Sequence, residues 1–189
     1  DITQEKDVET LAEESPKCDA LIFLVGLAHK KGKGKELDEF RRINKQTLVN
    51  LLSILGEKDK LPAKIIFAST ISVYGEKINQ DFYHEDCKKS PYSPYAITKL
   101  EAEGFLSDSF LDKTWILRFA PVYASDFQLN INCRTRAGTW FYKVGDGTKK
   151  LSLCNLENIG VAVESILKDK VPAGIIIFLT KLNIHTMIF

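Results

Sequence analysis

Short apolar runs alternate with longer helical patterns along this 189-residue chain, and this alternation limits its possible folds more than any other feature. The apolar runs are strand-sized and cover residues 19–25, 64–69, 114–119 and 174–179. Apolar residues at helical spacing occupy the stretch after the first run and the stretch that follows Asn155. Ser93 and Pro94 form a good N-cap and first-turn pair, so a further helix is predicted to begin there. Apolar strands that alternate with helices predict an α/β fold with a doubly wound parallel sheet.

The helical patterns also predict which side chains face the sheet. The inward positions of the helix after the first strand are Leu37, Phe40, Thr47, Leu48, Leu51, Leu52 and Leu55. Those of the helix that starts near Asn155 are Leu156, Ile159, Gly160, Val163, Ile166 and Leu167. Residues 121–153 interrupt the alternation with Asn, Gly, Arg and Lys, and are interpreted as an excursion from the sheet.

Composition and charge exclude several classes of function. With 26 basic and 25 acidic side chains, the net charge of +1 gives no reason to expect a nucleic acid or an anionic membrane as partner. The longest apolar runs are far too short to span a bilayer. The four cysteines include no CxxC pair, and the histidines add no ligand spacing, so no metal site is predicted. Reduced thiols are typical of a cytoplasmic protein, which is the expected location.

Tyr95 and Lys99 lie four residues apart at the start of a predicted helix, and therefore on one helical face. The pKa of a free tyrosine is near 10. A lysine ammonium about 4 Å away stabilises a phenolate by about 4 kcal/mol at an effective dielectric of about 20. Such a lysine would lower the tyrosine pKa toward the range of a general base. Because a base alone cannot oxidise an alcohol, a nicotinamide cofactor is the natural partner in a doubly wound fold.

Hydroxyl groups follow the strand at 64–69, at the edge where the predicted helix with Tyr95 begins. Ser69, Thr70 and Ser72 are the candidates, and one of them could hold a substrate oxygen while Tyr95 takes its proton. The alternative is that these hydroxyls only satisfy backbone groups at a strand end. Ligands of open α/β sheets bind beyond the carboxyl ends of the strands, which supports a site at this edge, but the residues alone leave both interpretations of the hydroxyls open.

The segments "STISVYG" and "SPYAITKLEAE" resemble the extended short-chain dehydrogenase/reductase family, and within it the nucleotide-sugar epimerases and dehydratases. The resemblance implies Thr70, Tyr95 and Lys99 as the catalytic set and NAD as cofactor, with NADP left open. Further segments that resemble the family are "DIT", "LVGLAH", "RRINKQTLVNLL", "LRFAPVYA" and "LSLCNLENIGVAV". The cofactor-binding residues implied in this way are Asp1, Ile2, Leu24, Val25, Gly26, Asn44, Ser69, Tyr95, Lys99 and Ala120.

The chain departs from the family pattern at several points. No glycine-rich phosphate loop of the G-x-G-x-x-G type is present, and the resemblance begins at what would be the end of the third strand of the fold. We therefore expect a Rossmann-like domain that is incomplete at its N-terminus. Pro121 stands where many epimerases have an asparagine, and Ile71 and Ser72 replace the Asp–Glu pair of the dehydratases, which disfavours dehydration. The substrate-binding candidates are Thr70, Ser72, Pro121, Asn130 and Arg134.

These features predict an NAD-dependent nucleotide-sugar 4-epimerase-like protein. Its expected parts are a partial NAD(P)-binding domain at 1–120, a substrate-binding excursion at 121–153, and a return to the sheet at 154–189 that starts a truncated C-terminal lobe. Two alternatives stay open: a nucleotide-sugar reductase or dehydrogenase with the same residues, and a catalytically incomplete fragment or binding module. The resemblance also implies a homodimer formed through helices that include the one bearing Tyr95.

Overall fold

A parallel sheet forms the centre of the structure, a computed structural model that describes residues 1–28, 36–75, 83–127, 132, 136–137, 139–141 and 152–178. Its strands are β1 (Ala20–Phe23), β2 (Lys64–Thr70), β3 (Thr114–Phe119) and β8 (Gly174–Phe178), in the order β1-β2-β3-β8. All three pairings are parallel, and Thr70 of β2 lies opposite Phe119 of β3 at the carboxyl end. The four predicted strands are confirmed, with ends that differ by one or two residues.

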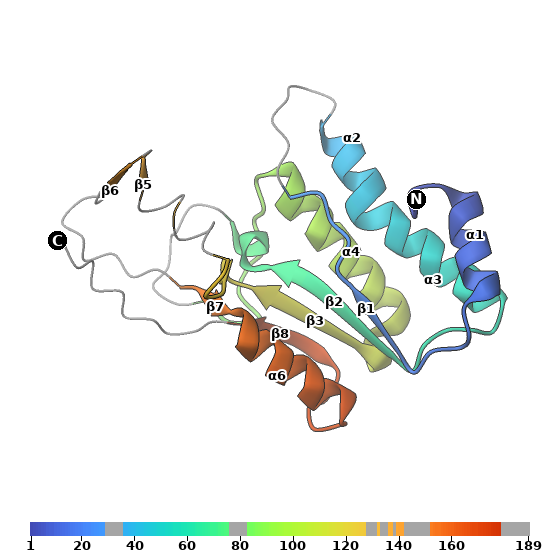
Figure 1. Cartoon of the computed structure of the whole chain (residues 1–189). Coiled ribbons are helices and arrows are strands. Elements are labelled where there is room, and N and C mark those ends of the chain that lie inside the picture. The colour runs from blue at the N-terminus through green and yellow to red at the C-terminus, as the bar shows by residue number, and fades with distance from the viewer. Residues whose placement is uncertain are drawn as a thin grey trace.

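Helices cover both faces of this sheet, as the predicted doubly wound fold requires (Figure 1). One face carries α1 (Glu5–Glu14), α3 (Thr47–Glu57) and α4 (Pro94–Phe110), with α2 (Glu36–Arg41) packed beside α4. The other face carries α6 (Leu156–Leu167). Short 3₁₀ turns at Ile71–Tyr74 and Leu111–Lys113 follow β2 and precede β3. Helix α1 was not predicted from the sequence.

Successive strand residues divide between two hydrophobic clusters because side chains alternate across a strand. Ile65 and Phe67 of β2 pack toward α1, α3 and α4, whereas Ile66 packs toward Ile166 of α6. The aromatic rings of Phe23 and Phe67 stack at a centroid distance of 6.2 Å. Burial of both faces explains why the strands read as continuous apolar runs.

The predicted helix over residues 36–55 is confirmed, but it contains a wider π-helical turn at Arg42–Gln46. Of its predicted inward residues, Phe40, Thr47, Leu48, Leu51 and Leu52 are buried. The π-helical turn was not predicted. Such turns are frequent at functional sites, and this one carries the fully buried Asn44.

The predicted inward face of α6 is partly wrong. Ile166 is buried and Ile159 and Val163 are half-buried, but Leu156, Gly160 and Leu167 are exposed. At 100° per residue, the buried and half-buried positions 159, 163 and 166 share one narrow stripe. The exposed positions 156, 160 and 167 lie about 80° around the helix from Ile159. The predicted face was therefore too wide.

The two ends of the excursion predicted at 121–153 are paired with one another. Strand β4 (Val122–Tyr123) pairs in parallel with β7 (Cys154–Asn155) in a separate two-stranded sheet. Within the excursion, β5 (Arg136–Ala137) pairs with β6 (Trp140–Phe141) in antiparallel orientation. The predicted substrate residues Asn130 and Arg134 lie outside the described residues.

A glycine controls the turn after β2. Gly75 has φ +116°, a left-handed conformation that disfavours side chains, and an added Cβ would lie 3.1 Å from the carbonyl oxygen of Ser90. The Ser90 amide donates to the Val73 carbonyl at 3.0 Å, which holds the chain against the 3₁₀ turn.

In the described part of the chain, no helix combines the length and apolar character needed to cross a membrane.

The fold predicts unequal reactivity of two cysteines. Cys154 is buried, and burial raises the pKa of its thiol to about 11, whereas Cys18 is exposed. Since the thiolate is the nucleophile, iodoacetamide at pH 8 should alkylate Cys18 at least about tenfold faster than Cys154. Peptide mass spectrometry over a time course measures both rates, with the protein in guanidinium chloride as the control in which the difference disappears. Equal rates in the folded protein would contradict this burial.

Candidate active site at the carboxyl end of the sheet

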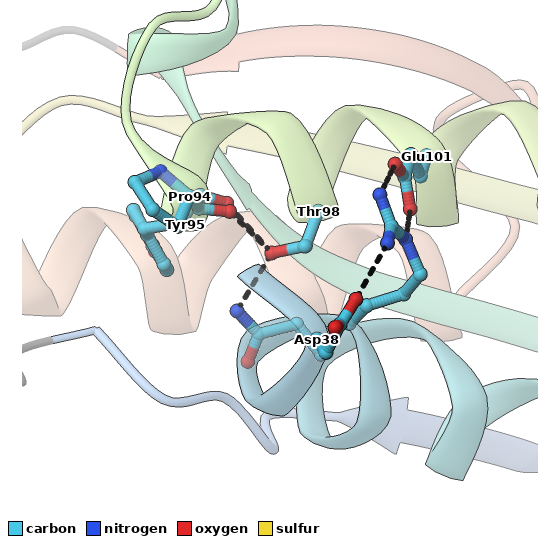
Figure 2. Close-up of polar contacts among 7 residues, drawn as sticks. Asp38, Pro94, Tyr95, Thr98 and Glu101 are labelled. Carbon is cyan, nitrogen blue, oxygen red and sulfur yellow. Dashed lines mark hydrogen bonds and ion pairs between the residues drawn. The ribbon is translucent and has the colours of Figure 1, made fainter. Parts of the chain in front are cut away.

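Tyr95 lies in the first turn of α4, where the sequence predicted it. The Ser93 hydroxyl accepts a hydrogen bond from the Ala96 amide at 3.3 Å, and Pro94 occupies the first helical position. The Thr98 hydroxyl lies below this turn and donates to the carbonyls of Pro94 and Tyr95 at 2.8 and 3.1 Å (Figure 2). The N-cap and the Thr98 hydroxyl thus fix the first turn and, with it, the backbone of Tyr95.

Lys99 extends from the next turn of α4 to the carboxyl end of β2. Its side chain is buried, and its Nζ donates to the carbonyl of Ala68 at 2.8 Å and more weakly to that of Val25 at 3.5 Å. The ammonium also lies 4.6 Å from the centre of the Phe67 ring. Burial lowers the Lys99 pKa to about 8, and the Glu103 carboxylate acts in the opposite direction.

The expected lowering of the Tyr95 pKa is wrong for this structure. Burial raises the Tyr95 pKa above its ordinary value. The spacing of Tyr95 and Lys99 indicates only the attraction of a lysine for a phenolate, and the cost of removing that phenolate from water opposes this attraction. In addition, the Lys99 ammonium donates to the Ala68 carbonyl. Tyr95 is therefore a neutral phenol at neutral pH in this state.

Thr70 ends β2 and caps the 3₁₀ turn that follows. Its Oγ1 accepts a hydrogen bond from the Ser72 amide at 3.2 Å, which is the backbone role considered above as an alternative. A hydroxyl that accepts through its oxygen keeps its O–H as a donor. Because Ala68 and Thr70 are two residues apart in β2, the Lys99 contact brings α4 to the strand end that carries Thr70.

Asn44 joins the loop after β1 to α4. Its Oδ1 accepts from the Leu27 amide at 2.6 Å, and its Nδ2 donates to the Leu27 carbonyl and the Thr98 hydroxyl at 3.2 and 3.0 Å. Gly26 lies between these groups, since an added Cβ would meet Lys99 Nζ at 3.3 Å and Asn44 Oδ1 at 3.5 Å. The structure therefore gathers Val25, Gly26, Asn44 and Lys99 around one point.

The other predicted cofactor residues make contacts elsewhere in the fold. The Asp1 carboxylate accepts from the Thr3 amide, Ile2 packs against the hydrophobic core, and Leu24 is 72% exposed. The buried Ala120 donates its amide to the Phe178 carbonyl at 3.1 Å. The Ser69 hydroxyl donates to Glu103. Pro121, a predicted substrate residue, accepts at its carbonyl from the Cys154 amide at 3.0 Å. The cofactor and substrate contacts of these residues stay predictions.

Sequence reasoning missed a buried ion pair beside this site. Glu103 of α4 and Arg118 of β3 are 2% and 1% exposed, and Arg118 Nε donates to Glu103 Oε1 at 3.0 Å. Two signals were present in the sequence: a glutamate four residues after Lys99, and an arginine inside the apolar run "TWILRF". A charge inside a strand that is buried on both faces requires a partner.

In the described ranges, no group of three or more metal-ligating side chains comes together.

The fold and the site define an α/β protein with a tyrosine–lysine pair at the carboxyl end of a parallel sheet. The sequence profile of the NAD dependent epimerase/dehydratase family matches residues 1–132, and the chain belongs to this family of enzymes. Over 93 residues it is 39% identical to "Uncharacterized UDP-glucose epimerase YtcB" of Bacillus subtilis (strain 168), a match that covers 48% of this chain and 28% of that protein.

Solved structures with the same fold include two epimerases from Bacillus cereus. The UDP-glucuronic acid 4-epimerase in complex with NAD has a TM-score of 0.74 and 24% identity, and the match covers 96% of this chain and 58% of that one. The UDP-N-acetylglucosamine 4-epimerase has a TM-score of 0.65 and 21% identity, with 94% and 62% covered. The chain thus spans less than two thirds of the length of these structures.

The buried Lys99 predicts a pH-dependent contribution to stability. Its pKa is about 8 in the folded state, against an ordinary value of 10.5, so between these values the unfolded state binds more protons. The free energy of unfolding should therefore rise with pH, relative to Lys99→Met, by about 3 kcal/mol from pH 7 to pH 10.5. Urea titrations at each pH measure the difference. Lys168→Met, at an exposed lysine, is the control and should show no such rise.

The Asn44 contacts predict a second stability effect. Asn44→Ala removes the acceptor of the Leu27 amide and the donor to Thr98, and should lower the free energy of unfolding by about 1–3 kcal/mol. Asn50→Ala, which removes only an exposed contact with Gln46, should cost less than about 0.5 kcal/mol. Urea unfolding compares the two variants. Equal costs would show that the Asn44 contacts do not stabilise the fold.

Proposed function

We propose that the protein is an NAD-dependent nucleotide-sugar 4-epimerase in which Thr70, Tyr95 and Lys99 are the catalytic residues. The observation that carries this proposal is the 2.8 Å hydrogen bond from Lys99 Nζ to the Ala68 carbonyl. It holds the helix of Tyr95 against the strand end of Thr70, so that a base, a cation and a hydroxyl lie at one edge of the sheet. The family membership and the matched 4-epimerases support the same reaction class.

The residues gathered at this edge fit a nicotinamide dinucleotide. The Lys99 ammonium has three N–H groups, and the described residues supply acceptors for two of them. A ribose hydroxyl would be a suitable acceptor for the third N–H. Gly26, which carries no side chain, lies beside the Lys99 ammonium. Val25, Gly26, Asn44 and Lys99 would therefore hold the nicotinamide end, with Asp1, Ile2, Leu24, Ser69 and Ala120 as the further expected contacts. NAD, when bound, supplies a reversible hydride acceptor at the sugar carbon.

Each catalytic residue has a defined task in this proposal. Tyr95 removes the proton from the 4-hydroxyl of the sugar and later returns it. Lys99 is charged at neutral pH because its pKa is about 8. Its charge would stabilise the phenolate form of Tyr95. Thr70 donates its O–H to the reacting oxygen. The burial of Lys99 and the partial burial of Tyr95 would strengthen the attraction between them when the phenolate forms.

The proposed substrate is a nucleotide sugar. One matched structure is the Bacillus cereus epimerase with UDP-glucuronic acid and NAD, at 25% identity and a TM-score of 0.72. In this chain, Ser72 lies two residues after Thr70, and Pro121 begins the excursion at 121–153, which we assign to substrate binding. Asn130 and Arg134 belong to the same proposed site.

The decisive variant is Tyr95→Phe in the protein at its natural length. Loss of a general acid–base group should lower kcat for epimerisation by about 10²–10⁴-fold. The Kd for NADH, from a fluorescence titration, should change less than about twofold because the ring remains. Tyr92→Phe, three residues earlier and 84% exposed, is the matched control and should keep full activity. Epimerisation by Tyr95→Phe at nearly the wild-type rate would refute the proposal.

The balance of cofactor separates this reaction from its nearest alternative. A matched structure, RMD from Pseudomonas aeruginosa, holds NADPH, with a TM-score of 0.70 and 19% identity. A reductase or dehydrogenase with the same three residues would consume or produce reduced cofactor in proportion to product. An epimerase leaves the absorbance of the nicotinamide pool at 340 nm unchanged while the sugar is converted.

A further inference from the structure

Glu103 lies on the same face of α4 as the two catalytic candidates, since residues 95, 99 and 103 are spaced by four. Its carboxylate accepts a hydrogen bond from the Ser69 hydroxyl of β2, while Lys99 donates to the carbonyl of Ala68. Helix α4 thus binds two successive residues of β2 immediately before Thr70. These contacts determine where the strand end lies relative to Tyr95.

Arg118 fixes the chain on the other side of Thr70. Its guanidinium donates to both oxygens of Glu103, to the Tyr74 hydroxyl and, at 3.1 Å, to the Glu85 carbonyl. It also lies 4.9 Å from the centre of the Tyr74 ring. Tyr74 ends the 3₁₀ turn that Thr70 caps, and the Glu85 carboxylate accepts from the Ile177 amide of β8 at 3.0 Å. Arg118 therefore ties this turn and the segment around Glu85 to Glu103.

We infer that Glu103 and Arg118 are positioning residues for the reaction, which hold Thr70 in place against Tyr95 and Lys99. The inference rests on the proposed function of those three residues. Thr70 is held from both sides, by Glu103 through Ser69 and by Arg118 through Tyr74. A displacement of about 1 Å in a catalytic group can lower the rate by about 100-fold, so contacts that fix the strand end to this accuracy matter to the reaction. The attraction of Glu103 for the Lys99 ammonium also keeps that lysine charged.

The first test measures position without any assay of activity. Hydrogen exchange, followed by mass spectrometry, compares wild type with Ser69→Ala and Glu103→Gln. Exchange over residues 66–74 should become at least about fivefold faster in both variants, with no change in α1 or α6. Glu101→Gln is the matched control, because Glu101 lies on α4 like Glu103 and also pairs with an arginine, but its partner is Arg41 of α2, at 2.8 Å (Figure 2). Its exchange over 66–74 should equal that of wild type.

The second test measures the reaction in the protein at its natural length. Ser69→Ala and Glu103→Gln should each lower kcat at least about tenfold. In Glu103→Gln, which changes no expected cofactor contact, KM and the Kd for NADH should change less than about twofold. If Glu103 acts through Ser69, the double variant should be no slower than the slower single one. Glu101→Gln should retain the wild-type kcat. Should Glu103→Gln fail to fold, Ser69→Ala carries the test alone, since it removes a single hydroxyl.

The outcomes distinguish this inference from the proposed function. Unchanged exchange and unchanged kcat in Ser69→Ala would overturn the positioning role, as would multiplied rate losses in the double variant. Equal effects of Glu101→Gln would overturn it too. The two variants could also show faster exchange over residues 66–74 while the wild type converts no nucleotide sugar. That result would reject the epimerase proposal and support the contact of Glu103 with β2.

Discussion

The buried ion pair between Glu103 and Arg118 is the interaction on which the arrangement of the site depends. Two charges that are removed from water are costly unless each finds close partners, and here the arginine donates to both carboxylate oxygens. Hydrophobic clusters on the two faces of the sheet attract the helices but fix their position along the strands only loosely. The ion pair is directional. It therefore selects one placement of α4 against β2 and β3.

The features that sequence reasoning found are those with local signals. Continuous apolar runs indicated the four strands, and Ser93 with Pro94 indicated the start of α4 where the structure has it. From these followed the carboxyl edge of the sheet as the place of the site and the approach of α4 to the end of β2, but not the contact of Lys99 with the Ala68 carbonyl. The inward face of α6 was only half right, because a stripe of apolar residues does not show which part of it meets the sheet.

Contacts between distant segments could not be predicted in this way. Glu103 and Arg118 are 15 residues apart on different elements, and nothing local pairs them. The π-helical turn at Arg42–Gln46 is recognisable only from what Asn44 reaches, which is the backbone of Leu27 and the hydroxyl of Thr98. The prediction of a lowered Tyr95 pKa was wrong for a related reason. Burial depends on the whole fold, whereas the spacing of Tyr95 and Lys99 does not.

Three charged side chains of α4 and β3 are buried, and the sum of their charges bears on the role proposed for Tyr95. Among the described residues, the buried charged side chains are Lys99, Glu103 and Arg118. Glu103 and Arg118 neutralise one another, so the group carries one net positive charge while Tyr95 is neutral. In the proposed reaction, loss of the Tyr95 proton would bring that sum to zero. Burial raises the Tyr95 pKa in this structure, so the proposed phenolate depends on Lys99 to compensate its charge.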